Sequence, residues 1–133
     1  MIDPLLERVM AADAEMLGHL GIEVTEASAD LVVLRGNPNR ALRNSFDVVH
    51  GSHVFALMDT AAAYALASRG IHAATIGAHV TFSRPVVAGS DIMATATVMT
   101  AGRTLATVRG DVKADGRIAS VATFQFAVRP PQV

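Results

Sequence analysis

The stretch HVFALMDTAAAYALAS, residues 53–68, decides the fold of this chain, and Asp59 is its only carboxylate, lysine or arginine. A helix that is apolar on nearly every side is normally buried, and burying an unpaired carboxylate is costly. Aspartate is also a poor residue for the middle of a helix, because its side chain competes for nearby backbone groups. We therefore expect that Asp59 either has a hidden partner or serves a chemical role.

Start and stop signals place two helices. Ser52 is a suitable N-cap for a helix over 53–69, and Gly70 stands where a C-terminal glycine belongs. A second helix is predicted to begin at Pro4, directly behind an aspartate N-cap, and to end by Gly21. The long central helix needs cover over most of its surface.

Strand patterns and turn signals supply that cover. Strands are predicted over 22–27, 30–35, 75–82, 91–100, 103–113 and 117–128, with Asp115-Gly116 as the hairpin turn before the last one. Residues 37–51 form a long loop, and such loops are often functional. The order predicts an α+β fold, in which a strongly curved antiparallel sheet, mostly a meander, wraps around the central helix. A second copy of the chain would cover what the sheet leaves open.

Composition excludes several classes of protein. The 133 residues suit one domain over 1–133, and 51% hydrophobic residues argue against disorder. The net charge is −1 and the basic residues are scattered, which predicts no nucleic-acid partner. The absence of cysteine excludes disulfides and thiol catalysis. Neither a signal-peptide layout nor a membrane-length apolar run is found, so we expect a cytoplasmic protein without a membrane partner.

The entrance to the central helix is the second informative feature. The first backbone N–H groups of a helix lack partners and carry partial positive charge. Gly51 has no side chain to block access to its own N–H, so a carbonyl oxygen placed there would be polarised and an oxyanion stabilised. Gly51 alone could equally make a tight entry turn. Together with Asp59 downstream, it favours a chemical site.

Helix geometry then constrains how the two groups can act. Gly51 and Asp59 are eight residues apart, which along one helix is roughly 12 Å. One small carbonyl group cannot contact both. If both act on one substrate they must come from different copies of the chain, which predicts a two-fold dimer with two sites across its interface.

A set of residues in the same region resembles a known family. Asn44, His50-Gly51, Asp59 and Phe82-Ser83-Arg84-Pro85 followed by Gly89 resemble, in order and spacing, the hotdog-fold acyl-CoA thioesterases of the PaaI-like (phenylacetic acid degradation) group. The resemblance runs from about residue 15 to 128. It implies a hotdog fold, hydrolysis of an acyl-CoA to a carboxylic acid and free CoA, and a homodimer that assembles into a homotetramer. It implies no cofactor, since CoA is part of the substrate, and no metal.

The resemblance also implies roles for individual residues. Asp59 would act as nucleophile or as general base on water, and the Gly51 N–H would polarise the thioester carbonyl. Asn44 would orient the substrate or water, His50 would hold the loop or assist at the carbonyl, and Thr75 would position the water. From the residues alone, Thr75 is more often a plain strand threonine and Asp59 remains open to a structural role.

Substrate contacts are implied at three further positions. Ser52 stands where the family has the second glycine of His-Gly-Gly, and its side chain is expected to narrow the acyl pocket. Phe82 would contact the substrate, for which aryl and medium-chain acyl groups both remain open. Arg84 is expected to bind CoA, and Arg103 and Arg117 are further candidates for its phosphates. Each of these arginines taken alone is more often an ordinary surface residue.

Other functions fit the sequence less well. The histidines do not have the spacing of a common metal site. Ser52-His53 lacks the Gly-x-Ser-x-Gly elbow of a serine hydrolase, and a hydratase would need an Asp–His arrangement that is not found. The alternative that remains is a non-catalytic acyl-CoA-binding hotdog protein, for which the serine at position 52 leaves room.

Overall fold

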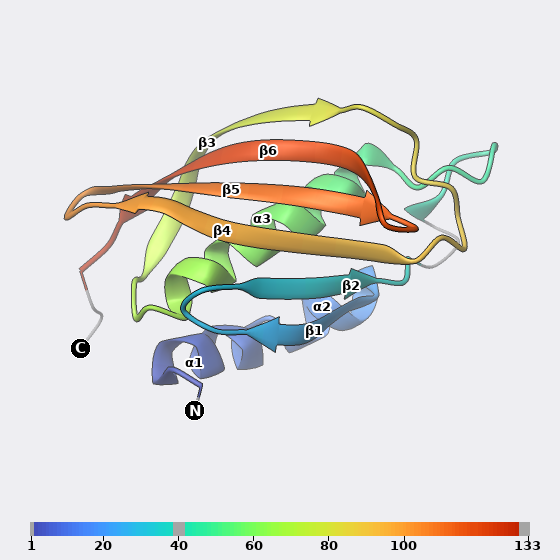
Figure 1. The fold of residues 1–133 in the computed structure, drawn as a ribbon. Helices are drawn as coiled ribbons and strands as arrows, with labels where there is room; N and C mark the ends of the chain where they lie inside the picture. The colour runs from blue at the N-terminus through green and yellow to red at the C-terminus, as the bar shows by residue number, and fades with distance from the viewer. Residues whose placement is uncertain (1, 39–41, 131–133) are drawn as a thin grey trace.

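A curved antiparallel sheet wraps around one long helix, α3 (Gly51–Ala67), as Figure 1 shows. The computed structural model describes residues 2–38 and 42–130. The other elements are α1 (Pro4–Ala12), α2 (Ala14–Leu20), β1 (Ile22–Ala27), β2 (Val32–Gly36), β3 (Ala73–Phe82), β4 (Ile92–Ala101), β5 (Leu105–Ala114) and β6 (Arg117–Val128). The predicted α+β class is confirmed. Residues 39–41 of the predicted loop lie outside the described residues.

The strand order corrects the predicted meander. The six strands run β1-β2-β4-β5-β6-β3, and each neighbouring pair is antiparallel. β3 therefore pairs with β6 and not with β4, which follows it in the chain. Tight turns already pair β4, β5 and β6 with one another, so only the outer edge of β6 is left for β3. β3 and β1 are the two edges of the sheet.

Two predicted helix boundaries were wrong. The first helix breaks at Asp13, which caps the end of α1 and the start of α2. The Asp13 carboxylate accepts a 2.8 Å hydrogen bond from the buried Tyr64 hydroxyl, a contact that fixes the break against α3. Burial and then this carboxylate raise the pKa of Tyr64 above its usual value. The N-cap of α3 is His50 and not Ser52, so the helix begins two residues earlier than predicted.

The core lies between α3 and the inner face of the sheet. Leu57, Met58 and Tyr64, which the sequence left open as core or pocket residues, are all buried. They pack in one cluster with sheet residues such as Val108 and Phe124. Gly70 takes a left-handed φ of 73° directly after the helix, as a glycine at this position predicts. The helix is therefore held along its length as a rigid rod.

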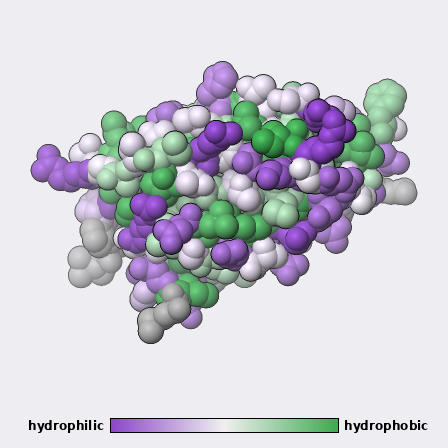
Figure 2. All heavy atoms as spheres, in the orientation of Figure 1, coloured by the Kyte–Doolittle hydropathy of each residue, from purple (hydrophilic) through white to green (hydrophobic). Residues whose placement is uncertain are grey.

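The outer face of the sheet is polar, in contrast to the core. The alternation predicted for β5 is confirmed, since Val108 and Val112 are buried whereas Arg109 is exposed. Hydrophilic side chains lie among apolar ones over the side of the molecule that Figure 2 shows. No helix in residues 2–38 and 42–130 is long and apolar enough to cross a membrane.

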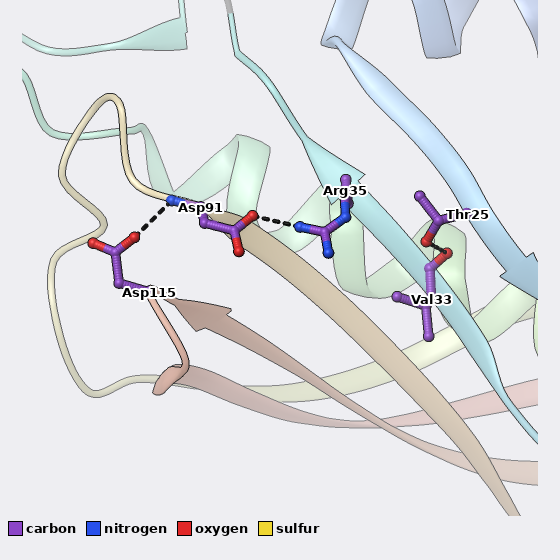
Figure 3. A network of polar contacts seen from close by, with 5 residues as sticks. All are labelled: Thr25, Val33, Arg35, Asp91 and Asp115. Carbon is purple, nitrogen blue, oxygen red and sulfur yellow. Dashed lines mark hydrogen bonds and ion pairs between the residues drawn. The ribbon is translucent and has the colours of Figure 1, made fainter.

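A polar network ties three strand ends together near the β5–β6 hairpin (Figure 3). Arg35 of β2 forms an ion pair with Asp91, which precedes β4. The backbone N–H of Asp91 donates a 2.9 Å hydrogen bond to the Asp115 carboxylate in the hairpin turn. Asp115 and Gly116 both have positive φ, as the Asp-Gly hairpin signal predicts. The network fixes the hairpin relative to the end of the sheet.

His53 ties the first turn of α3 to α2. Its Nε2 lies 2.8 Å from the Leu20 carbonyl oxygen, which can only accept, so Nε2 carries the hydrogen. Its Nδ1 is buried without a hydrogen-bond partner among the described residues. Burial lowers the pKa of His53, and the bond to Leu20 opposes this only in part. The folded protein therefore favours neutral His53.

We expect His53 to make stability pH-dependent. Below its ordinary pKa of 6.5 the unfolded chain takes up a proton at His53 that the folded chain does not, so the free energy of unfolding falls with pH. Urea unfolding between pH 8 and 5 should show a smaller loss for His53→Gln than for the wild type. His79→Gln, at an exposed position, is the control and should keep the wild-type slope. Equal slopes for His53→Gln and the wild type would contradict this account.

Candidate active site

The entrance to α3 presents free backbone donors. Backbone hydrogen bonds hold the incoming loop, since His50 N–H donates to Leu42 and Val49 N–H to Val86, both at 2.8 Å. The N–H groups of His53 and Val54 donate back to the His50 carbonyl. The Gly51 N–H donates to no described residue, and Gly51 is exposed. A donor is therefore available at the positive end of the helix, as predicted.

A small cleft opens beside this donor. It has a volume of about 240 Å³ and is lined by Val48, Val49, Gly51, Val54, Phe82, Ser83, Arg84, Pro85 and Val86. A Cβ added to Gly51 would lie 3.5 Å from the Phe82 ring, so this ring packs over the helix entrance. Phe82 is still 54% exposed. Gly51, Phe82 and Arg84, three of the predicted site residues, thus meet in one cleft.

Asp59 lies further along the same helix, and its environment corrects the sequence analysis. The carboxylate is half-buried and not enclosed in the core. Its Oδ1 accepts a 2.8 Å hydrogen bond from the Thr75 hydroxyl of β3. Among the described residues it has no ion-pair partner. Asp59 and Thr75 are therefore brought together, but on a face that the chain leaves open and away from the Gly51 cleft.

The open face of α3 is a continuous stripe. Phe55, Ala56, Asp59, Thr60 and Ala63 are half-buried, whereas most other residues of the helix from His53 onward are buried. The spacing of these five residues puts them on one side of a helix. The sequence suggested burial on nearly all sides because alanine at 56 and 63 reads as apolar wherever it lies. The stripe is the side that this chain's own sheet does not cover.

Asn44 has a structural task in the loop. Its Oδ1 accepts hydrogen bonds from the N–H groups of Phe46 at 2.8 Å and Val48 at 3.1 Å. This turn holds Asp47 at a left-handed φ of 57°. Only the amide nitrogen of the Asn44 side chain is left for a substrate or water. Asn44, His50 and Ser52 are exposed and do not line the cleft, so their predicted roles in catalysis and binding stay predictions.

A second cleft adjoins the first. It has a volume of about 190 Å³ and is lined by Arg84, Pro85, Val87, Ser90, Ala114, Asp115, Arg117 and Ala119. Arg84 and Pro85 belong to both clefts. The sequence analysis did not include Ser90 or Asp115, although the Asp-Gly turn signal marked where the hairpin would end. Arg103 lies in the β4–β5 turn, at the opposite end of the sheet from Arg117.

The largest cleft lies elsewhere. It has a volume of about 720 Å³, and its lining includes Leu5, Val9, Ile71 and Val128, from α1 and from the ends of β3 and β6. None of the predicted site residues lines it. Within the described part of the chain, no three histidine or carboxylate side chains are grouped so that they could hold a metal ion.

Comparison with known proteins agrees with this geometry. Residues 46–120 match the sequence model of the thioesterase superfamily. The chain is 33% identical over 84 residues to acyl-coenzyme A thioesterase PaaI of Escherichia coli (strain K12), a match that covers 63% of this chain and 60% of that protein. The matched region thus spans less than two thirds of that relative's length.

Solved structures extend the likeness. A mutant of the phenylacetic acid degradation protein PaaI from Thermus thermophilus is 26% identical, with a TM-score of 0.79 over 85% of this chain and 97% of that one. The E. coli PaaI structure is 24% identical, with a TM-score of 0.84 over 92% of this chain and 94% of that one, and shows the fold. The predicted hotdog fold and PaaI-like family are confirmed. Since the family match covers more than half of the sequence, this chain belongs to the thioesterase superfamily.

Proposed function

We propose that this protein hydrolyses acyl-CoA thioesters at sites shared between two subunits, each site combining Gly51 of one subunit with Asp59 of the other. The observation that carries the proposal is the placement of a free amide donor and a half-buried carboxylate on one rigid helix, roughly 12 Å apart. The family supplies the reaction class, and the E. coli relative is an acyl-coenzyme A thioesterase.

The edge of β3 supports pairing between two copies. An exposed strand edge is a template for another strand, and proteins usually guard such edges with charges or bulges. At the other edge, β1 carries the exposed Glu23 and Glu26. β3 has a bulge at 75–77, but its only ionisable side chain is His79. Ile76 and Phe82 are each more than half exposed on it. We infer that β3 pairs with β3 of a second copy.

Such pairing would assemble the site. Two copies of β3 related by a two-fold axis run antiparallel, so the beginning of one strand lies beside the end of the other. Thr75, which holds Asp59, is near the beginning of β3, and Phe82, which packs over Gly51, is at its end. In a register with Thr75 opposite Phe82 of the partner subunit, the carboxylate of one copy faces the amide donor of the other. The open stripe of α3 would then be covered.

The chemistry follows from the two groups. The thioester carbonyl oxygen accepts from the Gly51 N–H, which stabilises the oxyanion as the tetrahedral intermediate forms. Asp59 takes a proton from the attacking water, or attacks the carbonyl itself and is released by water in a second step. Collapse breaks the C–S bond, CoA leaves as a thiolate and takes up a proton, and the acid is released. The Thr75 hydroxyl keeps the Asp59 carboxylate oriented.

The alternative of a non-catalytic acyl-CoA-binding protein makes a different prediction. It would bind acyl-CoA through the same clefts without turnover, and the exposed Ser52 beside Gly51 is the feature that favours it. Assembly into a tetramer, preference for an aryl or a medium-chain acyl group, and a cytoplasmic location remain predictions from the resemblance.

Replacement of Asp59 tests the assigned reaction. With a panel of aryl and medium-chain acyl-CoAs, the wild type should release CoA, and Asp59→Asn should lower kcat by a factor of 10² or more, on the order of the contribution of a positioned base. Asp30→Asn, at an exposed position between β1 and β2, is the control and should keep wild-type kcat. If Asp59→Asn retains full kcat, the role given to Asp59 is wrong. Binding without turnover by the wild type would favour the alternative.

Removal of the Gly51 amide tests the other half of the site. Proline is tolerated at the first position of a helix, and the His50 backbone, at φ −57° and ψ 140°, already has the conformation required before proline. Gly51→Pro therefore deletes the N–H and should lower kcat about 10²-fold. Gly51→Ala adds a Cβ at ordinary contact distance and keeps the N–H, so it should lose far less. Equal losses in the two variants would mean that the N–H is not the group that matters.

A further inference from the structure

The two small clefts form one groove. The first contains Gly51 and the second contains Arg117, and both include Arg84 and Pro85. The groove therefore leads from the entrance of α3, across the segment that follows β3, to the β5–β6 hairpin. These three segments lie at the same end of the molecule in Figure 1. Each cleft alone is small, but together they form an elongated path on the surface.

Arg84 and Arg117 are held close together along this path. The N–H groups of Ser83 and Arg84 donate to the Ala119 carbonyl at 2.8 and 3.0 Å. Arg117 precedes Ala119 by two residues on the same strand, a distance of about 7 Å along the strand. Both arginines are exposed. Their backbones are therefore fixed, whereas their side chains are free to close on a ligand.

The carboxylates nearby are already engaged. Asp115 lines the second cleft, but its carboxylate accepts from the Asp91 N–H, and Asp91 is paired with Arg35 (Figure 3). Over residues 2–38 and 42–130, neither Arg84 nor Arg117 has an acidic partner. Two neighbouring unpaired guanidinium groups repel one another unless an anion lies between them. Guanidinium groups also match the geometry of phosphate oxygens.

The spacing along the sheet connects this pair with the reacting end. Phe82, which packs over Gly51, pairs with Ser120 of β6. Arg117 precedes Ser120 by three residues, about 10 Å along the strand. A ligand with its thioester at the Gly51 N–H and an extended flexible arm would thus bring a phosphate to the two arginines.

We propose that Arg84 and Arg117 form a phosphate clamp, and that the groove binds the phosphopantetheine arm of the substrate on the subunit that supplies Gly51. This inference rests on the proposed function for the position of the thioester. The shared chemistry is a thioester joined by a pantetheine arm to a phosphate. Two sources carry it: CoA, and the phosphopantetheine group of an acyl carrier protein. Arg103, at the far end of the sheet, takes no part.

The test separates phosphate binding from chemistry. Arg84→Gln and Arg117→Gln should each raise KM for acyl-CoA about tenfold at unchanged kcat, as expected for the loss of a charge-assisted hydrogen bond. The same acyl group on pantetheine, which has no phosphate, should be hydrolysed with equal KM by the wild type and both variants. Arg117→Lys should fall between wild type and Arg117→Gln, and Arg103→Gln should match the wild type. A KM unchanged for acyl-CoA, or raised equally for acyl-pantetheine, would overturn the clamp.

Binding of free CoA by calorimetry keeps the inference separate from the proposed function. If CoA binds the wild type and is lost with Arg84→Gln and Arg117→Gln, the clamp stands even where no acyl-CoA is turned over. If acyl-CoA is hydrolysed and CoA binding is unaffected by both variants, the function stands and the clamp falls. A wild type that does not bind CoA at all would also overturn it.

The source of the phosphate is resolved by two substrates with one acyl group. Acyl-CoA and acyl carrier protein loaded with the same acyl group should both respond to Arg117→Gln if the clamp holds the phosphate next to pantetheine. A response with acyl-CoA alone would place the outer phosphates of CoA in the clamp, and a response with acyl carrier protein alone would identify the protein-bound arm as the ligand. A response with neither would overturn the clamp.

Discussion

The rigidity of α3 is the constraint on which the other features depend. The helix carries a free amide donor at its entrance and a carboxylate two turns later, and it cannot bend to bring them to one carbonyl. Packing against the inner face of the sheet fixes the rod along most of its length. Two helices from two copies therefore give the simplest arrangement in which both groups reach one thioester.

The parts of the surface that one chain leaves open agree with this requirement. The stripe around Asp59 on α3 and the edge of β3 are neighbours, linked by the hydrogen bond from Thr75 to Asp59. A carboxylate that keeps its solvent access on one side needs no buried ion pair to offset its charge. The same position would become a dry, enclosed site once a second copy covers it, which strengthens electrostatic interactions there.

The sequence predicted the helix and strands well because their signals are local. Asp3-Pro4, Gly70 and Asp115-Gly116 mark chain reversals and caps through backbone preferences that need no distant partner. The place of β3 at the sheet edge and the break at Asp13 depend on contacts far along the chain, with β6 and Tyr64, and could not be predicted. The site was predicted as residue types and spacing. The half-buried setting of Asp59 and the groove shared through Arg84 required the fold.

Complementation between two inactive variants tests the shared site most directly. Asp59→Asn and Gly51→Pro subunits carrying different affinity tags would be co-expressed, and mixed dimers purified through both tags. If each site takes one group from each subunit, one site of the mixed dimer has both lesions and the other has none, so about half of the wild-type kcat should return. A mixed dimer as inactive as its two parents would show that both groups act within one chain, and would contradict the account.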